Sequence, residues 1–170
     1  EKRRPVLLSE VPQYLKDAYI SIEDERFYSH NGVDIKRTVA STIRYILNRG
    51  NSSAGGGSTI TQQTVKNSFK DKSDSGFAGV ERKIREISRA YKLEKLLSKD
   101  QILELYLNII FVGGSNNLGV EVGAEYYFNK SASDLDLAEC AFLAGINNSP
   151  NSYNPYGEKD KSELIKKRTK

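Results

Sequence analysis

Apolar side chains recur at helical spacing along most of this chain, and the alternation of apolar and polar residues that is typical of strands is nearly absent. A helix face repeats at i, i+3, i+4 and i+7, whereas a strand face repeats every second residue. The clearest helical stripe is formed by Leu15, Ala18, Tyr19 and Ile22. The pattern predicts a mainly α-helical fold, whose first helix has Pro12 in its first turn and ends near Asp24.

Capping residues mark the starts of further helices. Asp34 precedes one apolar stripe, and the pairs Thr59 with Gln62 and Ser98 with Gln101 have capping-box spacing. The predicted helices cover residues 34–47, 59–69, 80–91, 98–108, 120–128 and 135–144, the last of them closed by Gly145. Residues 49–57 and 70–79 lack periodicity, and we expect loops there.

Composition limits the classes of partner and site. The chain has 170 residues, enough for one core, and its 26 Lys and Arg against 22 Asp and Glu leave a net charge of +4. That bias fits an anionic partner, and nucleic acid, phospholipid and pyrophosphate all stay open. One Cys and one His exclude an internal disulfide and a zinc site of Cys and His ligands. Cys140 and His30 are interpreted as structural residues.

Glu23 is a candidate general base. It continues the row of Leu15 and Tyr19 by another i+4 step, so we expect it at the core side of its helix or at the edge of a cleft. A carboxylate that loses hydration there has a raised pKa and can take a proton near neutral pH. The alternative from periodicity alone is a surface acid at the end of a helix.

Cationic side chains offer candidates for binding an anion. A glycine run leads into Ser58 and a helix start, although the Gly-Lys-Ser/Thr of a P-loop is missing. Lys66 lies one turn further on, and Arg82 and Lys83 precede Glu86 at i+4 and i+3 spacing. The alternative is ordinary intrahelical ion pairs, worth about 0.2–0.5 kcal/mol each.

Together these fragments resemble the peptidoglycan glycosyltransferase domain, family 51, of bifunctional penicillin-binding proteins and their monofunctional relatives. The resemblance covers nearly the whole chain, and its five motifs occur in the family's order. They are Glu23–Gly32, Gly57–Gln63 with Lys66 and Asn67, Arg82–Glu86, Ile102–Asn108, and Leu143–Ile146 with Pro150, Tyr153 and Pro155.

The resemblance implies polymerisation of lipid II into β-1,4 glycan strands with displacement of undecaprenyl pyrophosphate. Glu23 would then act as the base, and Glu86 would position the cations or the acceptor sugar. Lys66, Arg82 and Lys83 would hold the leaving pyrophosphate. Contacts to the donor sugar or phosphate are implied for Ser58, Gln62, Gln63 and Asn108. No cofactor is obligatory, and a divalent cation such as Mg²⁺ at Glu86 is left open.

The implied architecture is a lysozyme-like head, about residues 9–34 and 78–170, with a smaller mobile jaw at about residues 35–77. The amphipathic helix 35–47 is the candidate for partial insertion into lipid. The implied partners are lipid II, the growing glycan strand, the membrane surface and other cell-wall synthesis proteins, but no nucleic acid. We expect a domain cut from a longer chain, anchored by an N-terminal helix at the outer face of the bacterial cytoplasmic membrane.

Two other readings stay open. A muramidase or lytic transglycosylase also uses a glutamate in a sugar cleft, but it protonates a leaving sugar oxygen and needs no row of cations. A non-catalytic basic module would bind anionic lipid or nucleic acid in a salt-sensitive manner that is indifferent to Glu23.

Overall fold

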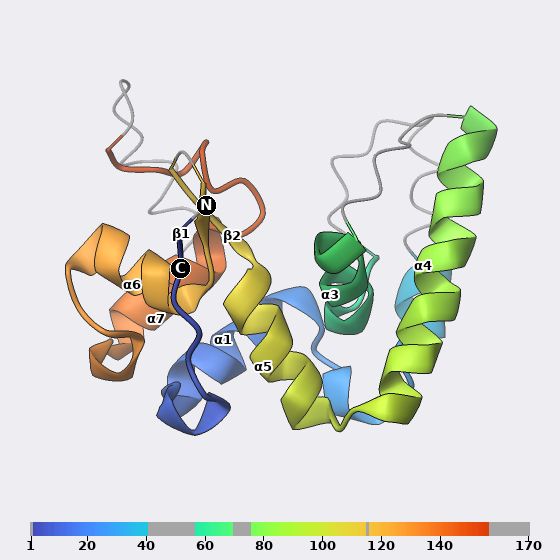
Figure 1. Ribbon diagram of the computed structural model, residues 1–170, viewed down its shortest axis with the longest axis horizontal. Coiled ribbons are helices and arrows are strands. Elements are labelled where there is room, and N and C mark those ends of the chain that lie inside the picture. The colour runs from blue at the N-terminus through green and yellow to red at the C-terminus, as the bar shows by residue number, and fades with distance from the viewer. Residues whose placement is uncertain (1, 41–56, 70–75, 115, 157–170) are drawn as a thin grey trace. The chain divides into compact units, whose positions relative to one another are not determined.

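The protein is mainly helical, which confirms the fold class expected from the periodicity. The computed structural model in Figure 1 describes residues 2–40, 57–69, 76–114 and 116–156. Its contacts divide the chain into two compact units, Glu1–Ile22 with Glu104–Lys170, and Glu23–Leu103. These units do not have the bounds of the expected head and jaw, and that division of the chain stays a prediction.

The first unit has a helical core. It contains most of α1 (Gln13–Glu23), most of α5 (Lys99–Ile109), α6 (Val120–Phe128) and α7 (Leu137–Ile146), with short 3-10 turns at Leu8–Glu10 and Ala132–Asp134. Tyr19 is fully buried and meets Tyr106 edge to face, with ring centroids 6.0 Å apart. Its hydroxyl donates to the backbone oxygen of Leu143 at 3.3 Å, so α1 is fixed against α5 and α7.

A small sheet lies beside these helices in the same unit. Its strand order is β1 (Lys2–Arg3), β3 (Asn117–Leu118), β2 (Phe111–Gly113), with β1 parallel and β2 antiparallel to β3. These strands are not predictable from the sequence, because two or three residues are too few to show an alternating pattern.

The predicted helices 59–69, 98–108 and 120–128 are confirmed to within one residue at each end. The predicted helix 80–91 is longer in the structure, Gly76–Leu96, so the expectation of a loop at residues 76–79 is wrong. The predicted end of α7 is also wrong. Asp136 and Glu139 form a capping box at its start. Gly145, expected to close the helix, lies buried inside it, and Asn147 caps the end instead. Gly145 therefore does not adopt the left-handed turn that the sequence suggested.

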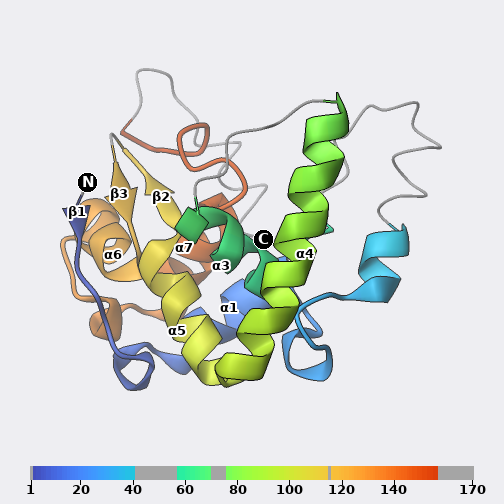
Figure 2. The ribbon, with the colours of Figure 1, turned by 45° about the vertical axis from the view of Figure 1, so that its right-hand side comes forward.

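The second unit is built around α3 (Ile60–Phe69) and α4 (Gly76–Leu96), which pack against each other (Figures 1 and 2). A 3-10 turn at Phe27–Ser29 and the start of α5 complete its described core, in which Phe27, Ile60 and Ile102 are fully buried. Residues 35–40 are helical, as predicted, and the rest of the expected helix 34–47 lies outside the described residues.

A helix that crosses a bilayer needs about 20 consecutive, mostly apolar residues. None of the helices within the described ranges is both long and apolar enough to do so.

Candidate active site

Glu23 and Gln63 form the first link of the candidate site. Glu23 is the last residue of α1, its side chain is half-buried, and its Oε2 accepts a hydrogen bond from Gln63 Nε2 at 2.8 Å. Gln63 lies in the first turn of α3. α3 therefore holds the carboxylate that is expected to act as the base, through a hydrogen bond from a neutral amide.

Asp24 attaches the same stretch of chain to α3 a second time. Its side chain is fully buried, and its Oδ2 accepts a hydrogen bond from the backbone N–H of Ile60 at 2.9 Å. His30 Nε2 lies 2.9 and 3.0 Å from the two carboxylate oxygens. A negative charge at the N-terminus of α3 is favourable because the exposed N–H groups there carry partial positive charge.

The start of α3 is a capping box, as its spacing predicted. Gln62 Oε1 accepts from the backbone N–H of Thr59 at 3.0 Å, and Thr59 Oγ1 accepts from the backbone N–H of Gln62 at 3.1 Å. The Thr59 hydroxyl donates to the backbone oxygen of Gly32 at 2.6 Å. Gly32 has a φ of +86°, and a Cβ there would lie 3.0 Å from the backbone oxygen of Ala90, so glycine allows the loop to approach α4.

A second clamp holds the loop that follows Glu23. Arg26 pairs with Asp34 through two hydrogen bonds of 2.9 and 3.0 Å, and Asp34 Oδ1 accepts from the backbone N–H of Arg37 at 3.0 Å. The Arg37 guanidinium donates to the backbone oxygen of Glu23. Burial by itself raises the pKa of Asp34, but the Arg37 N–H and the Arg26 guanidinium outweigh it, so the pKa lies below its usual value.

The third part of the site is a buried acid between two cations on α4. Glu86 is 5% exposed. Its Oε1 lies 2.5 Å from Lys83 Nζ and its Oε2 lies 3.4 Å from Arg82 Nη1. Lys83 also donates to Ser58 Oγ at 3.0 Å, which ties α4 to the residues just before α3. Lys83 is thus held at Ser58, just before α3, and Arg82 at the other oxygen of Glu86.

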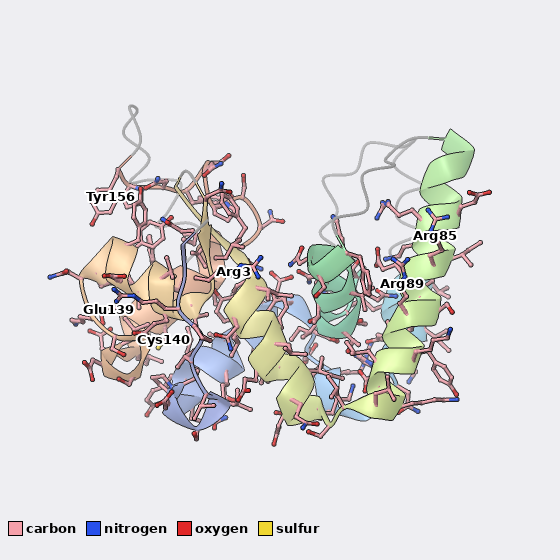
Figure 3. The ribbon with its side chains drawn as sticks, in the orientation of Figure 1. Arg3, Arg85, Arg89, Glu139, Cys140 and Tyr156 are labelled. Atoms are coloured by element: carbon pink, nitrogen blue, oxygen red, sulfur yellow. The ribbon has the colours of Figure 1, made fainter. Side chains whose placement is uncertain are left out.

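Lys66 and Arg89 extend the positive charge along the same two helices. Lys66 lies on α3 one turn after Gln63, its side chain is exposed, and within the described part of the chain it has no hydrogen bond or ion pair. Arg89, labelled on α4 in Figure 3, lies over the Phe69 ring with its guanidinium carbon 4.4 Å from the ring centroid. Lys66 is therefore available to an anionic ligand.

The structure gives structural roles to two residues for which substrate contacts were expected. Gln62 is fully buried in the capping box, and its side chain is not accessible to a substrate in this conformation. Asn108 belongs to the first unit, where its amide donates to the backbone oxygens of Val6 and Glu104 at 2.9 Å and accepts from the Val6 N–H at 2.8 Å. Its side-chain amide thus holds Val6 of the N-terminal segment and also bonds to its own helix.

Three roles in the two units were missed from the sequence. Asp24 was noted only as part of a motif, and its contact with Ile60 joins residues 36 positions apart. Glu104 accepts from the Leu8 N–H at 2.7 Å, across 96 positions. Glu94 pairs with Lys99 at 2.7 Å and accepts from Thr61 Oγ1 at 2.5 Å. Local spacing carries no signal for such partners.

A metal ion bound by protein side chains needs several donor groups that gather at one point. Among the described residues, no three His, Cys, Asp or Glu side chains gather as a metal site. Both carboxylate oxygens of Glu86 already face Lys83 and Arg82, and these cations would repel a divalent ion. The residues around Glu86 therefore do not fit the bridging cation that the sequence analysis left open.

Comparison with known proteins decides the family. A family model described as Transglycosylase matches residues 1–170. The chain belongs to the transglycosylase family. The membership recognised from the five motifs, glycosyltransferase family 51, is thereby confirmed, and this family member is a glycosyltransferase of peptidoglycan synthesis.

Curated relatives agree with this membership. The chain is 48% identical over 163 residues to penicillin-binding protein 1A of Clostridium botulinum (strain Langeland), covering 95% of this chain and 19% of the relative. It is 45% identical to penicillin-binding protein 1A of Clostridium acetobutylicum over 161 residues, 93% of this chain and 20% of the relative. It is 41% identical to penicillin-binding protein 1F of Bacillus subtilis over 163 residues, which is 96% of this chain and 22% of the relative. The transglycosylase chain thus spans about a fifth of these relatives.

Proposed function

We propose that this transglycosylase polymerises lipid II, with Glu23 as general base and the cations of α3 and α4 as the binding site for the leaving pyrophosphate. The observation that carries the proposal is the arrangement within residues 23–103. Gln63 on α3 holds Glu23, and Lys83 on α4 reaches back to Ser58 just before the same helix. Base and cations are thus attached to one packed pair of helices.

The chemistry assigns the roles. The 4-hydroxyl oxygen of the acceptor sugar attacks the anomeric carbon of the donor, and Glu23 takes the hydroxyl proton as the new bond forms. The bond from that carbon to pyrophosphate breaks, and the α link is inverted into a β-1,4 link. Pyrophosphate gains negative charge as it leaves, so preorganised cations lower the barrier more than an acid would. Lys66, Arg82 and Lys83 supply this charge, and Glu86 orients the last two.

The substrate lipid places the reaction at the outer face of the cytoplasmic membrane. The exposed side chains of Ile35 and Val39, 72% and 51% accessible, support contact of helix 35–40 with the lipid surface. A longer protein with an N-terminal anchor and other cell-wall synthesis proteins as partners is part of this proposal. The growing glycan strand is the second substrate, and the proposal includes no cofactor.

The test replaces the cations and follows both possible reactions. Lys83→Met and Arg82→Ala should each lower the rate of glycan formation from labelled lipid II by roughly a hundredfold, because each removes charge from the leaving-group site. Lys92→Ala, an exposed change on the same helix, serves as the control and should leave the rate unchanged.

Release of sugar fragments from finished peptidoglycan is measured in parallel with the same variants. A hydrolase would cleave that glycan and tolerate loss of the cations. Full polymerisation by both cation variants would contradict the pyrophosphate assignment, and cleavage without polymerisation would contradict the proposed reaction.

A further inference from the structure

A cavity of about 750 Å³ lies within residues 23–103, and neither Glu23 nor Gln63 lines it. Its walls come from the loop after η2 (Phe27–Ser29), from helix 35–40 and from α4. In Figure 2, helix 35–40 is the cyan segment to the right of α4. Pockets that bind small molecules have volumes of about 300–1,000 Å³. The cavity is thus large enough for a ligand other than the sugar substrates.

The wall is mostly apolar. Val33, Ile35, Ile87 and Tyr91 line it, and Ser88 adds only a small hydroxyl. Tyr91 is half-exposed, and Ile35 is 72% exposed, so these apolar surfaces are not buried against the described protein. An aliphatic chain that covers such apolar surface removes it from water, and the free energy of binding gains about 25 cal/mol per Å² covered.

One buried polar atom of the cavity-lining residues has no hydrogen-bond partner among the described residues. The His30 side chain is 9% exposed and lines the cavity, and its Nδ1 makes no hydrogen bond within the described ranges. Its other nitrogen, Nε2, faces the Asp24 carboxylate, which only accepts, so Nε2 carries the proton. Nδ1 is therefore the ring nitrogen left for a ligand, as an acceptor in neutral imidazole or as a donor in imidazolium.

The charges along the wall favour an anion. Arg26 and Asp34 line the cavity as a neutral pair, whereas Lys36 contributes an exposed positive charge. A phosphate monoester has a second pKa near 6, so it offers both a donor hydroxyl and acceptor oxygens around neutral pH. Such a group satisfies His30 Nδ1 in either protonation state and neutralises Lys36.

We infer that this cavity binds an anionic amphiphile, with an aliphatic chain against Ile87 and Tyr91 and a phosphate head at His30 and Lys36. The inference does not rest on the proposed function, because the cavity and the Glu23 site have separate walls. Two sources supply this chemistry, namely phosphatidic acid, a phospholipid with a monoester head, and a polyprenyl phosphate. The experiment distinguishes them.

Binding is measured by titration calorimetry with monomeric dodecyl phosphate and the 170-residue chain. We expect saturable binding of one molecule, and no binding of inorganic phosphate or of dodecyl trimethylammonium at the same concentration. Ser88→Trp fills the cavity and should weaken binding by roughly tenfold or more, and Lys36→Glu by a few-fold, equivalent to about 1.4 kcal/mol per tenfold change.

Lys92→Trp and Lys92→Glu are the matched controls, since Lys92 is exposed on the same helix and does not line the cavity. Both should bind as the unmodified chain does. Should Ser88→Trp fail to fold by circular dichroism, the Lys36 and Lys92 pair still decides the question. Equal affinity of Lys36→Glu and Lys92→Glu, or binding that never saturates, would overturn the inference.

The source follows from competition with bound dodecyl phosphate. Displacement by vesicles that contain phosphatidic acid assigns the cavity to a membrane phospholipid, and displacement by polyprenyl phosphate in detergent assigns it to a carrier lipid. Displacement by neither would overturn the assignment of the ligand as a lipid. Polymerisation of lipid II is assayed separately, so failure here leaves the proposed function to its own test.

Discussion

Glu23 and Asp24 are adjacent acids with different tasks, the first at the end of α1 and the second just beyond it. Glu23 is half-buried and shares a hydrogen bond with an amide of α3, whereas Asp24 is fully buried and accepts the first N–H of that helix. The two contact points, Gln63 and Ile60, lie about one turn apart on α3. Asp24 thus holds the start of the helix whose Gln63 side chain bonds the proposed base.

Replacing Asp24 tests that positioning role. Asp24→Asn removes the negative charge of the carboxylate that accepts hydrogen bonds from His30 Nε2 and from the backbone N–H of Ile60. We expect the free energy of unfolding to fall by about 2–3 kcal/mol. Urea denaturation measures the change. Asp17→Asn on the exposed side of α1 is the control, and equal effects of the two substitutions would contradict the role of Asp24.

Cys140 illustrates a residue whose environment removes its reactivity. Burial, aided by Asp136 and Glu139, raises the pKa of its thiol to about 11, and Figure 3 shows it on α7 beside Glu139. Its thiolate fraction at about pH 8 is therefore on the order of one in a thousand. The interpretation of Cys140 as a buried structural residue is confirmed.

Labelling with a chromogenic disulfide reagent checks this environment. In the folded protein at about pH 8 we expect Cys140 to react far more slowly than in guanidinium, where burial is lost. Equal rates in the folded and unfolded protein would show that the thiol is accessible and its pKa unshifted.

At the scale of the element, the start of α3 is held by polar contacts, in addition to the packing of α3 against α4. Its capping box is local, but the contacts of Thr59 with Gly32 and of Ile60 with Asp24 come from a distant loop. The loop is fixed in turn by the Arg26–Asp34 pair, and Asp34 caps helix 35–40. One charged clamp therefore supports two helix starts.

The Asp34 clamp should weaken in acid. Because its folded pKa is below the unfolded value of about 3.9, ionised Asp34 stabilises the fold above that pH, and the contribution is lost as pH falls further. We expect the difference in free energy of unfolding between the unmodified chain and Asp34→Asn, about 1–2 kcal/mol near neutral pH, to shrink below about pH 4. Urea denaturation over that pH range measures it. A difference independent of pH would contradict the charged clamp.

At the scale of the whole molecule, local sequence patterns predicted the helices but not the contacts between segments that are far apart in the sequence. The bounds of α6 match the prediction at both ends, because Gly119 and Asn129 on either side both have positive φ and stop the helix. The capping boxes at Thr59 and Ser98 were predicted because both partners lie within four residues. The short strands have no such signature.

The candidate site follows the same rule. Spacing identified Glu86 between Lys83 and Arg82, which are neighbours on one helix. It did not show that Asn108 binds Val6, across 102 positions, and the substrate contact implied for Asn108 stays a prediction. Charge spacing on a helix can be read from sequence, whereas the partner of a polar side chain depends on how distant segments pack.

The central claim is that Glu23 takes the proton of the acceptor hydroxyl. Glu23→Gln keeps the size of the side chain and an oxygen to accept from Gln63, but it removes the basic group. Glu25→Gln, an exposed change two residues on, is the matched control. Circular dichroism should show both variants folded.

The decisive measurement is the rate of glycan formation from labelled lipid II by these two variants, with the products separated by size. The account predicts that Glu25→Gln polymerises at the unmodified rate and that Glu23→Gln is slower by roughly a hundredfold to ten-thousandfold, the usual contribution of a general base. A folded Glu23→Gln protein that makes glycan as fast as the Glu25→Gln control would contradict it.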